Sequence, residues 1–462
     1  MIRSRKQLLD EPLRMDVGDD RISELPDSLI HLMISFLPIK NVVRTAVLSR
    51  RWKNLWLSFP FLDFSKWKSP TVMEDDEEEE EAVVLETEKF MNFLDRLMIL
   101  RNMSYIHKFC LTCDNEYFDE NRAKEWITTV VKCNVEELIV SMYFSLDIVS
   151  AELFTCGSLT KLVIELPETT EAELKLPESV SLPRVKILEL SGFIFLDEMS
   201  TQQLFSNCPV LEALSFYYCA WDGINTISIL APRLKSFILV GATTSKMEFV
   251  KLKIDAPNLK FIRYHDSAPV EFVTGSFPSL VGAGICLCYS NDDSLDPLSN
   301  FLVKLSNVQL LKLSCGAFHV IEFANVLSTS FPTLDSLLYL EMVDYQVSTI
   351  LKFLQFSPNL ITLVIDEVFY IDNEDALALD TVPHCLLLHL KSIEIQKFEG
   401  QPEELNFVKY ILGNARVLEK LILESETTSG SFVDLKKKTE IMEQLLIFPR
   451  ASANCEVKYS SS

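Results

Sequence analysis

The stretch Leu211-Glu212-Ala213-Leu214-Ser215-Phe216 sets the pattern on which most of the chain is built. Its apolar residues stand at the first, fourth and sixth positions, and one polar residue separates the last two. Alternation with a period of two predicts a β-strand that buries one face and leaves the other in solvent. The pattern recurs at Val185-Leu188-Leu190, Leu234-Phe237-Leu239, Leu259-Ile262-Tyr264, Val308-Leu311-Leu313, Leu360-Leu363-Ile365, Leu390-Ile393-Ile395 and Leu418-Leu421-Leu423.

Most successive copies lie 21 to 30 residues apart, and weaker copies stand at Leu159-Leu162-Ile164 and Leu280-Ala283-Ile285. This period is similar to that of leucine-rich repeats, in which each copy buries its leucines against the next. We therefore expect a curved solenoid with a parallel sheet along one side. The Asn or Cys that such repeats place three residues after the last apolar position is present only as Cys219 and Cys288, so the repeats are degenerate.

An apolar segment of about 40 residues before the repeats predicts three short helices. Pro26 suits the first turn of the first helix, and Pro38 ends it. A second helix is expected from Val42 to Leu48, and Ser49 is placed to cap a third. Because helices this short enclose little interior, we expect much of their apolar surface to contact a partner. The apolar positions of the first helix are Leu25, Leu29, Ile30, Met33, Ile34 and Leu37, and those of the third are Trp52, Leu55 and Trp56.

An unbroken acidic run occupies residues 74–81. Like charges repel one another and resist burial, so the run predicts an extended, solvated linker or loop. A second interpretation is a docking tail for a basic partner. In either case the run separates the helical segment from the repeats.

Composition excludes several classes of function for the 462 residues. The hydrophobic content of 48% predicts a mostly folded chain. The net charge of −23 argues against nucleic acid and anionic membranes as partners. Only 12 glycines are present, which disfavours the phosphate-binding loops of nucleotide-dependent enzymes. No stretch is long and apolar enough to span a membrane, and no signal peptide is recognisable, so we expect an intracellular protein.

Few residues suggest catalysis or metal binding. Cys110 and Cys113 have the spacing of half a zinc site, but no second pair follows and the surrounding residues predict a strand, so reduced core thiols are expected. Gly282-Ala283-Gly284 lies within a repeat and lacks the third glycine of a dinucleotide loop. We predict a non-catalytic protein with no catalytic residues, no metal and no cofactor.

The helical segment closely resembles the F-box of plant F-box proteins, without gaps. The resemblance is carried by residues 20–30, by Ser35-Phe36-Leu37-Pro38, and by residues 47–52 with Leu55-Trp56. It implies docking to the adaptor subunit of a cullin-RING (SCF-type) ubiquitin ligase. By this resemblance, the positions expected at or supporting that interface are Leu25, Pro26, Leu29, Ile30, Leu37, Pro38, Val43, Leu48 and Trp52.

The C-terminal segment resembles the FBD domain of plant F-box proteins. The resemblance is carried by Pro383-His384-Cys385, residues 390–395, residues 404–412 and residues 417–421, among others. Here Pro402 is expected to open a helix that ends at Gly413-Asn414, with the segment acting as an α/β cap on the solenoid. The predicted domains are an F-box at 19–65, a linker with a helical segment at 66–104, degenerate leucine-rich repeats at 105–380 and an FBD domain at 381–459.

Together these features predict the substrate-recognition subunit of an SCF-type ubiquitin ligase, residing in the nucleus or cytoplasm. The F-box would bind the adaptor, and the repeats would hold an unknown protein substrate. Two alternatives remain open: a non-degradative interaction scaffold built on the same repeats, and a receptor for a small ligand. Side chains that alternate with the buried leucines are the candidates for substrate binding, in particular Tyr217, Arg263, His265, Lys312 and Asp366.

Overall fold

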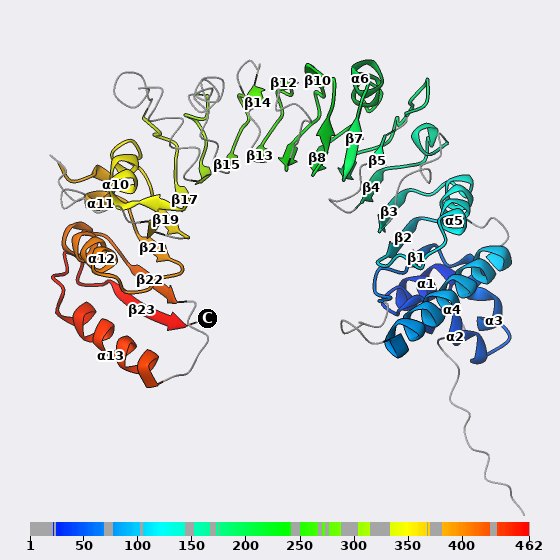
Figure 1. Cartoon of the computed structure of the whole chain (residues 1–462), viewed down its shortest axis with the longest axis horizontal. Coiled ribbons are helices and arrows are strands. Elements are labelled where there is room, and N and C mark those ends of the chain that lie inside the picture. Colours follow the sequence, from blue (N-terminus) through cyan, green and yellow to red (C-terminus); the bar gives the residue numbers. More distant parts are fainter. Residues whose placement is uncertain are drawn as a thin grey trace, which may run out of the picture. The chain divides into compact units, whose positions relative to one another are not determined.

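The architecture is that of a computed structural model, drawn in Figure 1. The chain divides into two compact units, Met1–Leu138 and Ile139–Ser462. The structure describes residues 22, 25–68, 77–101, 105–143, 152–166, 172–174, 176–241, 250–266, 270–272, 277–287, 304–314, 333–366, 368–369, 381–425 and 432–461.

In the first unit, residues 25–58 form the predicted three-helix segment. Its elements are α1 (Asp27–Ile34), α2 (Ile39–Arg44), η1 (Thr45–Val47), α3 (Trp52–Leu55) and η2 (Trp56–Ser58). The second helix differs from the predicted Val42–Leu48, because α2 starts at Ile39, directly after Pro38, and η1 follows it. Ser49 Oγ accepts a hydrogen bond of 3.4 Å from the Trp52 amide, as the sequence predicts. Ile30 and Ile34 form the inward face of α1 and are buried with Val42 and Trp52.

The rest of the first unit combines strands and longer helices: β1 (Phe61–Asp63), α4 (Glu77–Arg101), β2 (Lys108–Cys113) and α5 (Glu120–Lys132). β1 pairs in parallel with β2, so that Leu62 stands opposite Phe109. Asp119 caps α5, its carboxylate accepting a hydrogen bond of 2.9 Å from the Arg122 amide. α5 buries Trp126 and Val130 on one face.

The expectation that the whole acidic run is extended is wrong. Residues 77–81 of the run form the first turn of α4, and residues 74–76 lie outside the described residues. Acidic side chains are favourable at the positive N-terminal end of a helix, which offsets their mutual repulsion. The Tyr117 hydroxyl also donates a hydrogen bond of 2.8 Å to Glu80. The run is therefore partly the start of a structured helix.

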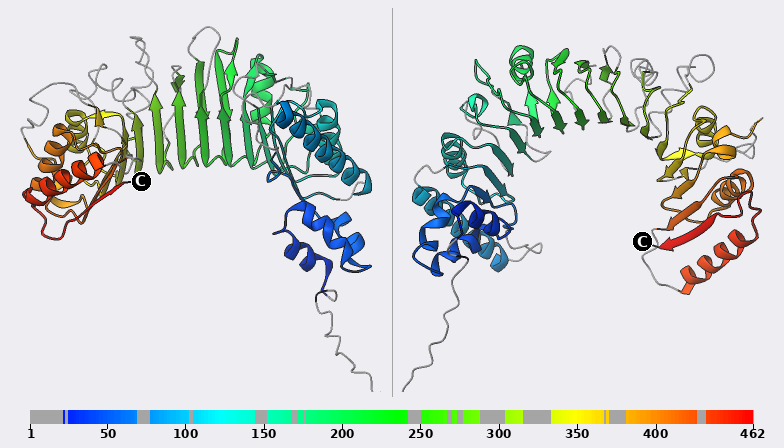
Figure 2. Two further views of the ribbon diagram at one scale, coloured as in Figure 1. Left: turned by 60° about the horizontal axis from the view of Figure 1, so that its bottom comes forward. Right: turned by 180° about the vertical axis from the view of Figure 1, so that it is seen from behind.

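The second unit is built on a parallel sheet (Figure 2). Each main strand pairs with the main strand before it and the one after it along the chain, and β3 (Glu137–Met142) contains the boundary between the units. The main strands are β4 (Lys161–Glu165), β6 (Ile187–Ser191), β8 (Ala213–Tyr217), β11 (Ser236–Val240), β13 (Phe261–Asp266), β15 (Gly282–Leu287), β16 (Leu310–Ser314), β17 (Tyr339–Val343), β19 (Thr362–Ile365), β21 (Ser392–Ile395), β22 (Lys420–Ser425) and β23 (Glu456–Ser461).

The register confirms the predicted solenoid. Leu188, Leu214 and Phe237 stand opposite one another on consecutive strands and are all buried. Every repeat identified in the sequence, including the two weaker copies, contributes one main strand. Strands outside the predicted repeats follow the same pattern, among them β3 with Val135-Leu138-Val140 and β17 with Leu337-Leu340-Met342.

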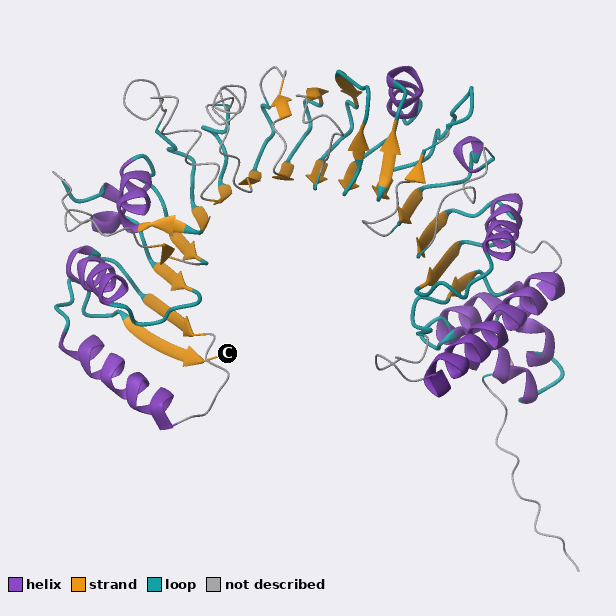
Figure 3. Ribbon diagram, viewed as in Figure 1, coloured by secondary structure: helices purple, strands orange, loops and turns teal. Residues whose placement is uncertain are grey.

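Shorter elements connect the main strands, and they lie on the side of the second unit opposite the parallel sheet (Figure 3). Some pair into small sheets, in the orders β5-β7-β9, β10-β12-β14 and β18-β20. Within this unit the main strands lie on the inner side of a curve, and α6, α10 and α12 lie on its outer side (Figure 1). The bounds are η3 (Leu153–Thr155), β5 (Ala172–Glu173), β7 (Phe193–Phe195), α6 (Glu198–Ser206), β9 (Ala220–Trp221), β10 (Thr226–Leu230), β12 (Val250–Asp255), β14 (Val270–Phe272), β18 (Tyr345–Gln346), α10 (Val347–Gln355), β20 (Val368–Phe369), α11 (His384–Leu388), α12 (Pro402–Asn414) and α13 (Phe432–Ile447).

The C-terminal segment continues the same sheet. α12 begins at Pro402 and ends at Asn414, as the sequence predicts. Glu404 is only 3% exposed, and its carboxylate accepts hydrogen bonds from the Gln401 amide at 2.8 Å and the Glu399 amide at 3.1 Å. This arrangement satisfies backbone donors at the start of the helix. In the described residues, no helix is long and apolar enough to cross a membrane.

Candidate protein-binding surfaces

The three-helix segment has a buried core and a band of exposed apolar side chains. The core isoleucines of α1 are at most 4% exposed, whereas Phe36 is 81% exposed and Val47 is 87% exposed. Apolar side chains in such numbers on one small segment are the mark of a protein-binding surface. We call this set the apolar band; it comprises Leu29, Leu32, Met33, Phe36, Leu37, Val47 and Leu48.

The residues expected at the adaptor interface divide into three groups by burial. Ile30 and Trp52 are buried, so they hold the helices together. They can support an interface by positioning exposed neighbours, but they do not contact a partner directly. Leu25 and Val43 are half-buried. The exposed members are Pro26, Leu29, Leu37, Pro38 and Leu48.

Four members of the apolar band were not among the predicted interface residues. Their signal is available in the sequence, because Leu32, Met33 and Phe36 continue the helical spacing on the side of α1 away from Ile30. Val47 lies beside Leu48 in the turn after α2. All of these residues are visibly apolar in the sequence. The helical period alone does not show which of two overlapping apolar faces of α1 points inward.

Arg51 fixes the start of α1. Its Nη2 atom donates a hydrogen bond of 2.6 Å to the Leu25 carbonyl oxygen and lies 2.5 Å from Oδ1 of Asp27. Asp27 stands in the first turn of α1, where a carboxylate is favourable. This contact ties α3 to the residues that precede α1, and so orients Leu25 and Pro26.

Arg101, the last residue of α4, ties that helix to the end of the three-helix segment. It is 3% exposed. Nη1 donates to the carbonyl oxygens of Phe59 at 2.6 Å and Trp56 at 3.3 Å, and Nη2 donates to that of Tyr105 at 3.2 Å. Burial lowers the pKa of Arg101 to about 10, so the guanidinium stays charged at neutral pH. Arg101 thus fastens the end of the three-helix segment, which carries the apolar band, to α4.

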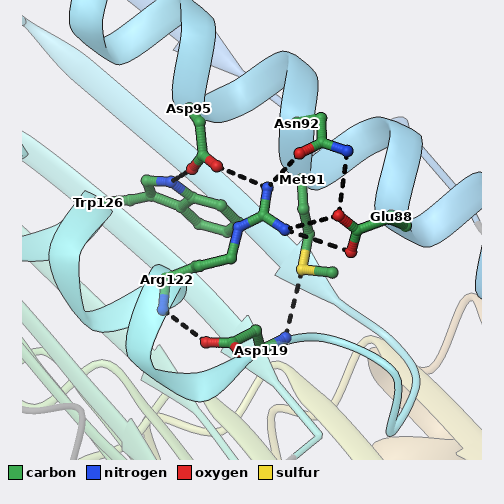
Figure 4. A network of polar contacts seen from close by, with 7 residues as sticks. All are labelled: Glu88, Met91, Asn92, Asp95, Asp119, Arg122 and Trp126. Carbon is green, nitrogen blue, oxygen red and sulfur yellow. Dashed lines mark hydrogen bonds and ion pairs between the residues drawn. The ribbon is translucent and has the colours of Figure 1, made fainter.

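A second arginine fastens α4 to α5 (Figure 4). Nη2 of Arg122 lies 2.6 Å from Oδ2 of Asp95, and Nη1 lies 3.2 Å from Oε1 of Glu88. The other oxygen of Asp95 accepts a hydrogen bond of 2.7 Å from the Trp126 indole. Asn92 accepts a further bond of 3.1 Å from Arg122. Three side chains of α4 therefore converge on one guanidinium from α5.

The strand face of the second unit brings three of the five predicted substrate-binding residues together. Arg263 and His265 lie on β13, and Lys312 lies on β16. Burial lowers the pKa of His265, and the positive charges of Arg263 and Lys312 lower it further, which indicates that all three are close. Lys312 also forms an ion pair with Glu341 of β17.

Tyr217 borders this cluster, whereas Asp366 lies apart from it. Tyr217 is on β8, and it shares a register position with Val240 of β11 and His265 of β13. Asp366 follows β19, and its Oδ1 lies 3.2 Å from Nζ of Lys397. Arg263, His265 and Lys312 therefore form the centre of the strand face, and Asp366 is paired with Lys397 outside it.

The comparisons with known proteins identify the family. Over 95% of its length, this chain is 30% identical to F-box/LRR-repeat protein 13 of Arabidopsis thaliana, and it covers 96% of that protein. The chain belongs to the F-box/LRR-repeat/FBD family of plant proteins. It is also 30% identical to the Arabidopsis FBD-associated F-box protein At4g13985 and 28% identical to the F-box/FBD/LRR-repeat protein At2g26030, each over 95% of this chain, covering 95% and 98% of those proteins.

Three family models match consecutive parts of the chain. The F-box domain model matches residues 22–64, and the FBD model matches residues 380–423. The model for the LRR repeats of FBD-associated F-box protein At5g56370 matches residues 123–275. The F-box match contains the whole apolar band. The matched LRR range includes Arg263 and His265, whereas Lys312 lies beyond it.

The described thiols of this F-box/LRR/FBD protein lie in its core. Nine cysteines in the described residues form no disulfide and are buried. Cys110 and Cys113 both lie on β2, and burial raises the pKa of Cys110 to about 11 and that of Cys113 further still. In the described part of the chain, no group of three or more His, Cys, Asp or Glu side chains is placed to hold a metal ion.

Proposed function

We propose that this chain is the substrate-recognition subunit of an SCF-type ubiquitin ligase complex, resident in the nucleus or cytoplasm. Proteins with an F-box and leucine-rich repeats generally serve as substrate receptors of such ligases. The observation that carries the proposal is the apolar band, because its side chains are exposed on helices whose own core is already filled. Burial of one such side chain stabilises a complex by about 1.5 to 3 kcal/mol.

The proposed mechanism requires no catalytic group in this chain. The F-box docks to the adaptor, and the strand face of the repeats holds a protein substrate near the ubiquitin-loaded enzyme. Proximity raises the effective concentration of the substrate, which accelerates transfer without an acid, base or nucleophile from this chain.

Adaptor binding by the full chain is the first test, measured by isothermal titration calorimetry with the purified adaptor. We expect Leu48→Asp to weaken binding at least about tenfold, since a carboxylate would enter an apolar contact. Leu446→Asp on α13 is the matched control, because Leu446 is 71% exposed and Leu48 is 63% exposed. Equal loss in both variants, or no binding by the folded wild-type chain, contradicts the proposal.

Ubiquitin transfer distinguishes the receptor from a non-degradative scaffold. The complete ligase is reconstituted with this chain, and ubiquitin attachment to proteins captured by the repeats is followed with time. A receptor gives transfer that Leu48→Asp abolishes. A scaffold binds the adaptor and the captured protein with no transfer above the background without this chain.

A further inference from the structure

Strand β15 leaves a gap in the side-chain cover of the strand face. Two of its consecutive outward positions are glycines, Gly282 and Gly284. Gly282 stands between Phe261 of β13 and Leu310 of β16. Neither glycine adds a side chain to this face; Gly284 is half-buried, and Gly282 is buried beside Phe261.

The border beside Gly282 is apolar. Phe261 is 47% exposed and Leu310 is 41% exposed, although both lie on the sheet. A methyl group added to Gly282 would come within 2.9 Å of Cδ1 of Phe261 and 3.6 Å of Cβ of Leu310. The Phe261 ring thus lies over Gly282, which is itself buried, and a side chain at this position would displace the ring. The exposed parts of Phe261 and Leu310 form a shallow apolar surface beside it.

The border beside Gly284 is basic. Gly284 stands between Arg263 and Lys312 in the register. The two basic residues are two strands apart, which places their backbones about 10 Å from each other. Lys312 is paired with Glu341, whereas no carboxylate of the described residues lies within ion-pair distance of Arg263. This site, in a chain of net charge −23, therefore retains an available cation.

We propose that the face formed by Phe261, Arg263, Gly282, Gly284, Leu310 and Lys312 binds a short segment of a partner protein that carries an apolar side chain next to a carboxylate. The apolar side chain lies against the exposed parts of Phe261 and Leu310. The carboxylate lies over Gly284 and pairs with Arg263. This proposal rests on the substrate-receptor function and names the chemistry of the substrate segment.

The geometry of the strand fixes the spacing expected in the partner. Phe261 and Arg263 are two residues apart on β13, so their backbones are separated by about 6.6 Å. An extended partner segment has the same spacing between residues i and i+2. We therefore expect an apolar residue two positions from an aspartate or glutamate. The surrounding negative charge disfavours an acidic segment elsewhere on the molecule, which confines binding to this face.

The test uses a display library of random twelve-residue linear peptides, selected on the full chain, with selected peptides resynthesised and titrated by fluorescence polarisation. Gly284→Asp is the decisive variant, since it places a carboxylate beside Arg263. A Cβ atom at Gly284 would lie 3.7 Å from Cγ of Arg263 and 3.9 Å from Cβ of Lys312, so the substitution fits without a clash. Gly284→Ala is its uncharged control.

A charge reversal gives independent support. Arg263→Glu removes the proposed anchor, and Arg233→Glu, at an exposed turn before β11, is the matched control. Thermal melts of all variants establish that each is folded. We expect the selected peptides to carry the apolar and acidic pair, and to lose at least about tenfold in affinity with Gly284→Asp and Arg263→Glu. Gly284→Ala and Arg233→Glu should bind as the wild type does.

Three outcomes would overturn the proposal: no peptide enriched, enriched peptides without an acidic residue, or affinity unchanged by Gly284→Asp. The experiment contains no adaptor, so it can fail while adaptor binding succeeds. In that case the chain remains a ligase subunit that recognises its substrate elsewhere. Conversely, peptide binding with no adaptor binding would support this face as a peptide-binding site and would contradict the proposed ligase function.

Discussion

Nη1 of Arg101, the last residue of α4, donates a hydrogen bond of 2.6 Å to the carbonyl oxygen of Phe59, just beyond the last turn of the F-box helices. The same guanidinium also reaches the carbonyl oxygens of Trp56 and Tyr105. One buried side chain therefore satisfies backbone acceptors from two segments, and the more distant acceptor, Trp56, lies 45 residues from Arg101 in the sequence. It joins the F-box to the rest of the first unit.

We expect Arg101→Met to lower the free energy of unfolding of the first unit by about 3 kcal/mol, because buried carbonyl oxygens lose their donors. Arg101→Lys should recover only part of this loss, since an ammonium group lacks the planar set of donors. Urea unfolding followed by tryptophan fluorescence measures both changes. Four of the five tryptophans, Trp52, Trp56, Trp67 and Trp126, lie in the first unit. A change below about 0.5 kcal/mol in Arg101→Met contradicts the prediction.

Adjacent residues of α1 should separate stability from adaptor binding. Ile30 is fully buried and Leu29 is 47% exposed. We expect Ile30→Ala to destabilise the first unit by about 2 to 5 kcal/mol, and Leu29→Ala by less than about 1 kcal/mol. Leu29→Ala should nevertheless weaken adaptor binding more than Ile30→Ala does at a temperature where both are folded. Denaturant titration measures the stability of both variants, and calorimetry on the same samples measures their adaptor binding. If Ile30→Ala weakens binding more than Leu29→Ala does, Leu29 is not on the binding face of α1.

The Arg122–Asp95 contact is suited to a double-mutant cycle. Arg122→Ala, Asp95→Ala and the double variant are compared by urea unfolding. Both side chains are partly exposed, so we expect a coupling free energy of about 1 kcal/mol. Asp95→Asn should cost less than Asp95→Ala, because the amide oxygen still accepts from the Trp126 indole. Additive losses in the cycle would show that the two residues stabilise the fold independently.

The core cysteines should resist alkylation in the folded protein. Burial raises the pKa of Cys208, Cys219 and Cys385 to about 12 in each case, and a raised pKa means that almost no thiolate is present at pH 8. Iodoacetamide at pH 8 should leave their peptides unmodified, as peptide mass spectrometry can measure, and urea should make them reactive. Rapid labelling of any of the three before unfolding contradicts this burial.

The strands were predictable because their signal is local. In Leu234-Phe237-Leu239 the alternation within a few residues fixes which side chains are buried, and β11 follows it residue by residue. The same alternation continues in β3 and β17, where Val140 and Met342 hold the last apolar position in place of leucine. The start of α4 was misread because repulsion within the acidic run was weighed without the helix end and the Tyr117 hydroxyl that stabilise it.

The candidate surfaces were predictable only in part. Residues that face outward follow from the alternation, so Arg263 and Lys312 could be named from the sequence. Their position on either side of Gly284 depends on the register across three strands, which is set by connecting segments of unequal length. In the F-box, two apolar faces of α1 overlap, and only the packing of the other helices selects Ile30 over Leu29 as the inward residue.

The nearest-neighbour order of the main strands has a consequence for how the second unit comes apart. Each main strand pairs only with those immediately before and after it, so no contact between distant strands of this sheet holds its ends together. Cooperativity in such an array passes from one repeat to the next. A core truncation in the middle, such as Leu311→Ala, should therefore divide the unit into two blocks that melt at different temperatures. Its unfolding is a sequence of local steps, and a single midpoint does not describe its stability.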